Sequence, residues 1–284
     1  MSLLSPDFQF SQRSLQDYVD CQRRFQLRYL DRLSWPAVES EPLSEQEARM
    51  RTGAAFHLQV QRYLVGVPAE RLSAMLASDH ADATDLRGWW DNYLRFSNIH
   101  PVQEQLVETT LSAPIHGYRL LAKYDLVRWE AGPAGEVTIY DWKTSQQKPP
   151  RQWLESRLQT RIYPYLLVQA GKFILNQEKV DPEHVKMVYW FAEQPREPEI
   201  FTYRTHGYQA DHEYLLEIIS EIEALAEDDF HLTEDEEKCK FCTYRSLCDR
   251  GISAGNIIPG QTFAAEDGAG DFELDFDQVA EIEF

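Results

Sequence analysis

The chain has 284 residues, 43% of them hydrophobic and 26% charged, and a formal net charge of −19 at pH 7. This length and composition suit a globular protein with one large domain or two small ones. No apolar run approaches the roughly 18 residues of a membrane span, and the sequence starts without the basic and apolar segments of a signal peptide. We therefore expect a cytoplasmic protein that does not associate with a membrane.

Residues 1–35 are predicted to contain a helix that carries one cysteine. Apolar residues such as Leu15 and Tyr18 recur there at helical spacing, and Ser14 is a candidate N-cap. Cys21 lies on the same helix. A lone cysteine on a helix is usually a small buried hydrophobic residue, so Cys21 gains a functional meaning only together with other cysteines.

Residues 36–100 are predicted to form a helical subdomain. His57 lies there, at the end of the sequence Gly53-Ala-Ala-Phe-His57. An imidazole can bind a divalent metal, and it accepts Mn²⁺ more readily than Mg²⁺, although a lone histidine on a helix is more often a packed or capped residue. Trp89 and Trp90 could stack on single-stranded bases, but packing within the subdomain is the simpler account.

The most informative stretch contains two predicted strands, 118–129 and 137–142, joined by a turn rich in glycine and proline. Asp125 lies near the middle of the first strand, and Asp141 and Lys143 lie at the end of the second. Side chains two residues apart on a strand face the same side, so Asp141 and Lys143 share a face. If the strands pair as a hairpin, Asp125 reaches that face too.

Two carboxylates and an ammonium group would then converge on one point. Mg²⁺ and Mn²⁺ prefer oxygen ligands and are often held by one or two carboxylates, waters and a substrate phosphate. A neighbouring lysine can orient or deprotonate the attacking water, or stabilise the transition state electrostatically. The alternative is an ordinary ion pair on a surface hairpin, which an Asp-x-Lys pattern taken alone favours.

An α/β core is predicted over residues 101–230, because strands and helices alternate there. Glu108, on a predicted strand at 102–113, is a possible supporting acidic ligand. The helix predicted at 153–170 carries Gln159 and Tyr163 on one face, and Pro164 should kink or break it. Three further elements are predicted: strands at 185–192 and 200–204, which should pair, and a long amphipathic helix at 208–227.

The polar residues of this core follow a recognisable order: Asp125, Asp141-Trp142-Lys143, Gln159 and Tyr163. This order resembles the PD-(D/E)XK nuclease superfamily, and within it the RecB-like branch with an iron–sulfur cluster, which includes CRISPR-associated adaptation nucleases and the AddB nuclease domain. The resemblance implies a restriction-endonuclease-like α/β core, a central mixed sheet flanked by helices, with a helical insertion and a region of four cysteines.

The resemblance also implies roles for single residues. Asp125 and Asp141 would bind the metal, Lys143 would be catalytic, and Gln159 and Tyr163 would support the site or the DNA.

A histidine on a helix upstream of the first aspartate is common in the RecB-like branch, so His57 is expected to be a further metal ligand, beside the carbonyl of Trp142. The sequence departs from the family at Ala122, since a glycine often stands shortly before the first aspartate.

Residues 231–255 contain Cys239, Cys242 and Cys248, which together with Cys21 are all the cysteines of the chain. Disulfides are rare in the cytoplasm, whereas four cysteines suit either structural Zn²⁺ or an iron–sulfur cluster. Zinc sites usually present two close cysteine pairs, and here one remote cysteine joins a triplet. The resemblance to iron–sulfur nucleases favours a [4Fe–4S] cluster, with zinc as the alternative.

Charge is unevenly distributed along the chain. Residues 256–284 are predicted to be an acidic, flexible tail that binds a protein partner, occupies a basic groove or only adds solubility. Phosphate contacts need cations, and two basic groups could supply them: Arg13, Arg23, Arg24, Arg28 and Arg32, and Lys143, Lys148, Arg151, Arg157 and Arg161.

The sequence therefore predicts a deoxyribonuclease that depends on Mg²⁺ or Mn²⁺. By resemblance it would be an exonuclease on single-stranded DNA or DNA ends, in DNA repair, recombination or CRISPR adaptation. One alternative is a non-catalytic iron–sulfur or zinc DNA-binding scaffold subunit of a helicase–nuclease complex. Another is a zinc-stabilised adaptor that acts through the acidic tail.

Overall fold

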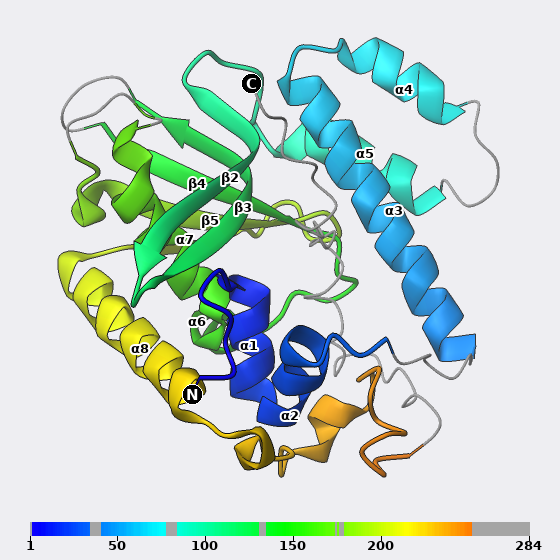
Figure 1. Ribbon diagram of the computed structural model, residues 1–284. Coiled ribbons are helices and arrows are strands. Elements are labelled where there is room, and N and C mark those ends of the chain that lie inside the picture. The colour runs from blue at the N-terminus through cyan, green and yellow to red at the C-terminus, as the bar shows by residue number, and fades with distance from the viewer. Residues whose placement is uncertain are drawn as a thin grey trace, which may run out of the picture.

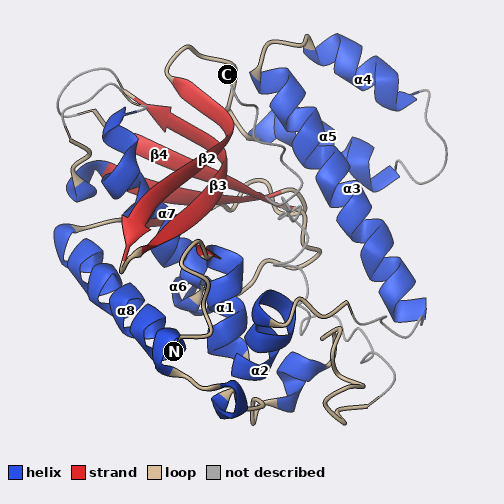
Figure 2. Ribbon diagram, viewed as in Figure 1, coloured by secondary structure: helices blue, strands red, loops and turns tan. Residues whose placement is uncertain are grey.

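The computed structural model describes residues 2–34, 41–77, 84–130, 135–173, 175 and 179–251, without the side chains of 41–47 and 173. Most of the turn predicted after the first strand, and the acidic tail, lie outside the described residues. Figures 1 and 2 show a mixed sheet with helices on both faces. The predicted α/β architecture is confirmed.

The sheet contains six strands in the described part of the chain. They are β1 (Gln9–Ser11), β2 (Gln105–Ile115), β3 (Tyr118–Trp129), β4 (Val137–Lys143), β5 (Val185–Phe191) and β6 (Glu199–Thr202). The order is β1-β3-β4-β5-β6, with β2 also paired to β3. The pairs β1–β3 and β4–β5 are parallel, and the others are antiparallel. The predicted pairing of β3 with β4 and of β5 with β6 is confirmed, whereas the three-residue strand β1 was not predicted.

The helices lie in two groups on opposite faces of the sheet (Figure 1). The longer ones are α1 (Gln12–Asp20), α3 (Glu41–Leu64), α4 (Ala69–Ala77), α5 (Thr84–Phe96), α7 (Leu158–Ala170) and α8 (Thr205–Ala224). The shorter ones are α2 (Gln22–Phe25), which continues as a π-helical turn over Gln26–Leu30, α6 (Arg151–Ser156), and 3₁₀ turns at Gly171–Phe173, Pro182–His184, Glu227–Asp229 and Glu236–Cys239. No described helix has the length and hydropathy required to cross a membrane.

Each face of the sheet has its own hydrophobic core. The larger core joins one face to α1, α7 and α8, and Leu15, Ile162 and Ile219 are fully buried in it. The smaller core joins the other face to α3, α4 and α5. It is built largely from aromatic rings, such as Phe56 stacked 6.1 Å from Trp190, because flat, bulky side chains fill the space between a helix layer and a sheet efficiently.

Two local expectations were wrong. The N-cap of α1 is Ser11, whose side chain accepts from the backbone N–H of Ser14 at 3.0 Å, while the Ser14 hydroxyl accepts from the N–H of Ser11 at 2.9 Å. Ser14 is therefore the third helical residue of a reciprocal capping box, a motif in which two residues three apart can each resemble the cap.

The helix predicted at 153–170 is interrupted at Arg157 and not at Pro164. Arg157 has extended backbone angles (φ −77°, ψ 140°), which end α6 and begin α7, while Pro164 lies within α7. The interruption coincides with a contact from outside the helix, because the backbone N–H of Leu158 donates to the side chain of Gln16. Tertiary structure therefore sets this boundary.

Candidate active site

The ladder between β2 and β3 is interrupted at one position. Val107 pairs with Leu126 and Thr109 pairs with Tyr124, so Glu108 and Asp125 stand opposite each other without pairing. Glu108 has a φ of 50°, in the left-handed region that non-glycine residues seldom adopt. Backbone strain of this kind costs about 1–3 kcal/mol and clusters at functional sites. The interruption therefore marks a candidate site.

The buried side chains of β3 change faces at the same position. Ala122 and Tyr124 belong to the larger core and Leu126 to the smaller one, but Val127 belongs to the larger core again. The alternation is therefore shifted by one residue around Asp125. Simple strand alternation, applied to the sequence, could not give the direction of the Asp125 side chain.

Asp125 is held from two sides. The backbone N–H of Trp142 on β4 donates to Asp125 Oδ2 at 2.7 Å, and His57 Nδ1 on α3 lies 3.2 Å from Asp125 Oδ1. Helix α3 passes very close to the residue after β4. A Cβ atom at Gly53 would lie only 2.8 Å from Thr144 Oγ1. Glycine at this position allows the approach, and His57 is one helical turn further along α3.

The structure gathers His57, Glu108 and Asp125 into one group of ligand atoms, all within 4.8 Å of one another. A second contact of Glu108 is an ion pair with Lys123 Nζ at 2.7 Å. Glu108 was predicted only as a possible supporting residue, and its direct place beside Asp125 depends on a backbone conformation that the sequence does not reveal.

Asp141, Lys143 and Gln159 form a second group on the side of the sheet that faces α7. Lys143 Nζ donates to Gln159 Oε1 at 2.9 Å and lies 3.1 Å from Asp141 Oδ2. Gln159 Nε2 donates to Asp141 Oδ1 at 2.6 Å. The amide of Gln159 thus bridges the carboxylate and the ammonium group.

Tyr163 lies behind this group. It is 3% exposed, and its ring packs 4.9 Å from that of Tyr124, whose hydroxyl donates to the Tyr163 carbonyl at 2.8 Å. The side chain of Trp142 belongs to the aromatic core on the other face. The backbone N–H of Trp142 donates to Asp125, and the expected role of its carbonyl as a metal ligand stays a prediction.

Burial and mutual repulsion raise the pKa values of two of the acidic residues, whereas His57 lowers that of the third. Burial raises the pKa of Asp141 to about 7, although Lys143 opposes this effect. Burial and the charge of Asp125 raise the pKa of Glu108. At Asp125 burial is outweighed by His57 and by the N–H of Trp142, so its pKa is lowered. Burial alone would lower the pKa of His57, but Asp125 raises it to about 9.

The residues present fit a divalent cation. Asp141 Oδ2 is buried and accepts no hydrogen bond in the described structure, having only the ion pair with Lys143. Two further carboxylates, Glu108 and Asp125, crowd together with a histidine nearby. Carboxylate oxygens with one imidazole are a donor set suited to Mg²⁺ or Mn²⁺, and a cation would offset their repulsion.

The four cysteines act on one another's pKa values, although one of them is more than two hundred residues away in sequence. Among the described residues, only His57, Glu108 and Asp125 form a group of three possible metal ligands within 4.8 Å. The pKa of the Cys239 thiol is raised, mainly by burial and then by Cys242 and Cys21. The pKa of Cys248 is raised to about 11, again mainly by burial, then by Cys242 and Cys21 and more weakly by Cys239. Two backbone turns shape the triplet, since the N–H of Cys242 donates to the Cys239 carbonyl at 3.0 Å and the N–H of Cys248 to the Tyr244 carbonyl at 3.0 Å. None of the four is in a disulfide.

Most members of the two predicted basic groups are engaged with carboxylates. Arg24 and Arg28 pair with Asp17, and Arg161 pairs with Asp211. Lys148 and Arg151 both pair with Glu199. These pairs reduce the positive charge that the groups can offer to a phosphate backbone.

A model of the PD-(D/E)XK nuclease superfamily matches residues 9–249. Among solved structures, that of SSO0001 has 13% sequence identity and a TM-score of 0.38, over 86% of this chain and 87% of that one. A protein from Eubacterium rectale with the name "Putative exonuclease" has 8% sequence identity and a TM-score of 0.43, over 75% of this chain and 79% of that one. Similarity at this level carries no argument about function.

No curated protein matches the sequence. The family match, by contrast, extends over most of the chain and includes the interrupted ladder, the Asp141–Lys143 pair and helix α7. The chain therefore belongs to the PD-(D/E)XK nuclease superfamily.

Proposed function

We propose that this protein is a metal-dependent deoxyribonuclease that acts as an exonuclease on single-stranded DNA or DNA ends. The proposal is carried by the contacts of His57 with Asp125 and of Lys143 with Asp141, in a chain of the nuclease superfamily. The two pairs are close enough to interact, because burial and, more weakly, the charge of Asp125 raise the pKa of Asp141. Preference for DNA ends is supported by the RecB-like order of these residues. A role in DNA repair, recombination or CRISPR adaptation belongs to the same proposal.

His57, Glu108, Asp125 and Asp141 are the residues that would hold Mg²⁺ or Mn²⁺, together with the carbonyl of Trp142. The bound cation would supply Lewis acidity, neutralising charge on the phosphate and lowering the pKa of a coordinated water. The protein supplies the rest of the geometry. His57 holds one oxygen of Asp125 and the Trp142 N–H holds the other, so the carboxylate is fixed before any ligand arrives.

Lys143 is proposed to orient the attacking water and to stabilise the negative charge that develops on the phosphate. A positive group that is already oriented needs no rearrangement during the reaction, which is why such groups contribute strongly to catalysis. Gln159 fixes the ammonium of Lys143 through its side-chain oxygen. Tyr163 contributes by packing, since it is buried against Tyr124.

The four cysteines are proposed to hold a [4Fe–4S] cluster with a structural role. Four thiolates from two distant parts of the chain are a donor set that suits such a cluster, and they would tie Cys21, at the end of α1, to the segment 239–248. Zinc, the alternative, uses the same ligands.

One observation favours a second candidate, a DNA-binding scaffold subunit without catalysis. The formal charge is −19, and many cations of the two basic groups are paired with carboxylates. A protein of this kind would depend on a partner for much of its DNA affinity. The ordered contacts of Lys143 and Gln159 favour catalysis over this account.

Replacing Lys143 should abolish most of the nuclease activity. Removal of one preorganised group that stabilises developing charge costs about 10²–10³-fold, so we expect Lys143→Ala to cleave end-labelled single-stranded DNA at least about 100-fold more slowly than wild type in Mn²⁺. The matched control is Lys186→Ala. Lys186 lies on β5, pairs with Thr138 and forms a surface ion pair with Glu136, and its loss should leave the rate unchanged.

The same assay separates the two candidates. If wild type and Lys143→Ala bind DNA equally and neither shortens it, the catalytic account fails and the scaffold account replaces it.

Replacing Glu108 should weaken metal binding. Glu108→Gln keeps the volume of the side chain and removes one negative charge. Changes to residues that support a metal typically cost 10–100-fold in affinity, so we expect Mn²⁺ titrated calorimetrically, in the absence of DNA, to bind at least about tenfold more weakly. Glu104→Gln is the control, because Glu104 is exposed just before β2. Equal affinity of both variants and wild type would exclude Glu108 as a ligand.

Replacing Cys21 should remove the cluster. Anaerobically purified wild type should contain about four iron atoms per chain and absorb visible light, and Cys21→Ser should lose both properties. A colourless wild type with stoichiometric zinc would contradict the iron–sulfur assignment, while leaving the four cysteines as metal ligands.

A further inference from the structure

Helix α7 begins with the help of a residue from another helix. The first N–H groups of a helix have no partner within it and are usually satisfied by a side chain at the N-cap. The N-cap of α7 is Arg157, whose side chain makes no such bond. Instead the N–H of Leu158, the first residue of α7, donates to Gln16 Oε1 at 3.0 Å. Gln16 is therefore a cap supplied by α1.

The residue after Leu158 is the one that organises the catalytic lysine. Gln159 accepts from Lys143 Nζ at 2.9 Å and donates to Asp141 Oδ1 at 2.6 Å. A shift of the backbone at Leu158 moves the start of the Gln159 side chain with it, because the two residues share a peptide unit. The Gln16 contact thus lies one residue from the group that fixes Lys143.

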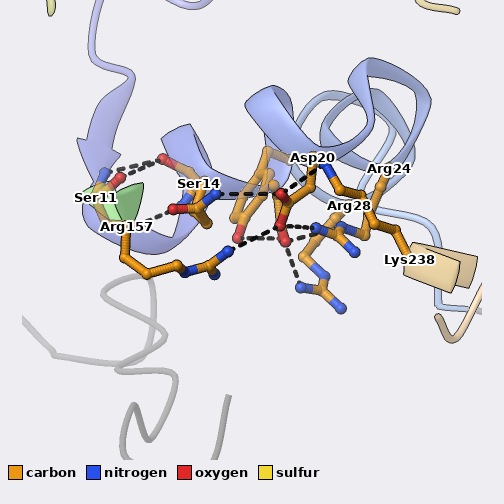
Figure 3. A network of polar contacts seen from close by, with 10 residues as sticks. Ser11, Ser14, Asp20, Arg24, Arg28, Arg157 and Lys238 are labelled. Atoms are coloured by element: carbon orange, nitrogen blue, oxygen red, sulfur yellow. Dashed lines mark hydrogen bonds and ion pairs between the residues drawn. The ribbon is translucent and has the colours of Figure 1, made fainter. Parts of the chain in front are cut away.

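The nitrogen of the Gln16 side-chain amide also has a partner. Gln16 is 6% exposed, and its Nε2 donates to Asp20 Oδ1 at 3.3 Å. Figure 3 shows Asp20 among three cations from separate parts of the chain. The distances to the Asp20 carboxylate oxygens are 3.0 Å from Arg24 Nη2, 3.2 Å from Lys238 Nζ and 3.7 Å from Arg157 Nη1.

This network lies between the cysteines and α7. Asp20 precedes Cys21 in sequence, and Lys238 precedes Cys239. Arg157 is the residue between α6 and α7. A continuous set of polar contacts therefore runs from the two cysteine-bearing segments, through Asp20 and Gln16, to the start of α7.

We infer that Gln16 is a positioning residue for Lys143, which acts by fixing the start of α7 and with it Gln159, and that Asp20 anchors Gln16 to the two segments that carry the cysteines. The inference rests on the proposed nuclease function for its catalytic readout. It gives the N-terminal helix a part in catalysis, although no residue of that helix reaches the site described above.

The first measurement needs no activity. Hydrogen exchange of the Leu158 amide should be about tenfold faster in Gln16→Met than in wild type, since the substitution keeps the volume and removes the acceptor. Gln12→Met is the control, because Gln12 lies on the same helix and is 7% exposed. Gln16→Glu retains an acceptor oxygen but places a carboxylate against Asp20, so it should restore protection only in part. Gln16→Asn is a milder variant if Gln16→Met folds poorly.

The second measurement is kinetic. In Gln16→Met the kcat for single-stranded DNA should fall about tenfold with KM unchanged, as expected when an interaction is lost only in the transition state. Gln16→Glu should recover only part of the rate, because it keeps the acceptor for Leu158 and loses the donor to Asp20. In a Gln159→Ala background, Gln16→Met should have no further effect, because residues that act through one another are not additive.

The outcomes are distinguishable. If wild type cleaves DNA and Gln16→Met has faster Leu158 exchange but an unchanged kcat, Gln16 is only a cap and the inference is overturned, while the proposed function stands. Additive losses in the double variant would overturn it as well. If wild type does not cleave DNA at all, the proposed function fails and this inference fails with it.

Discussion

The candidate site is organised around two carboxylates that are held close together where the pairing of β2 and β3 is interrupted. Glu108 and Asp125 face each other there within 4.8 Å of His57, and Glu108 holds a left-handed backbone conformation. Buried carboxylates cost stability unless they are paired or bind a cation. The protein offsets part of this cost with His57, Lys123 and the N–H of Trp142. The remainder is what makes the site suitable for a metal.

Each compensating group comes from a different element, which explains how the fold supports the site. His57 is supplied by α3, which the aromatic core attaches to one face of the sheet. Gln159 is supplied by α7, which the larger core attaches to the opposite face. Asp125 and Asp141 lie on strands between them. A site assembled in this way is rigid only if both helix layers are docked, so the two cores and the chemistry are linked.

Much of this arrangement could be predicted from the sequence. The strands that carry Asp125 and Asp141 were placed within about one residue, because alternation, β-branched residues and a glycine-rich turn are strong local signals. A role for Gln159 near the site was implied by the resemblance to the nuclease superfamily, and its contacts with Asp141 and Lys143 come from the structure. Local signals fail where distant segments decide the structure. The break at Arg157 and the contact of Gln16 with Leu158 depend on α1, and the left-handed conformation of Glu108 has no signature in its residue type.

The N-terminal helix illustrates the same limit. Cys21 could be associated with the C-terminal triplet by counting cysteines, but Asp20 and Gln16 are polar residues of a kind that usually lies on a solvated helix face. The burial of Gln16, the partial burial of Asp20 and their contacts with Leu158 and Arg157 follow only from packing. The residues that connect the cysteine segments to the start of α7 are therefore ones that no motif would select.

We propose that this charge cluster binds a divalent cation, and anomalous diffraction from crystals grown with Mn²⁺ would locate the metal. We expect a manganese peak bounded by His57, Glu108, Asp125 and Asp141. Manganese bound elsewhere, with no peak among these four residues at saturating concentration, would contradict the claim.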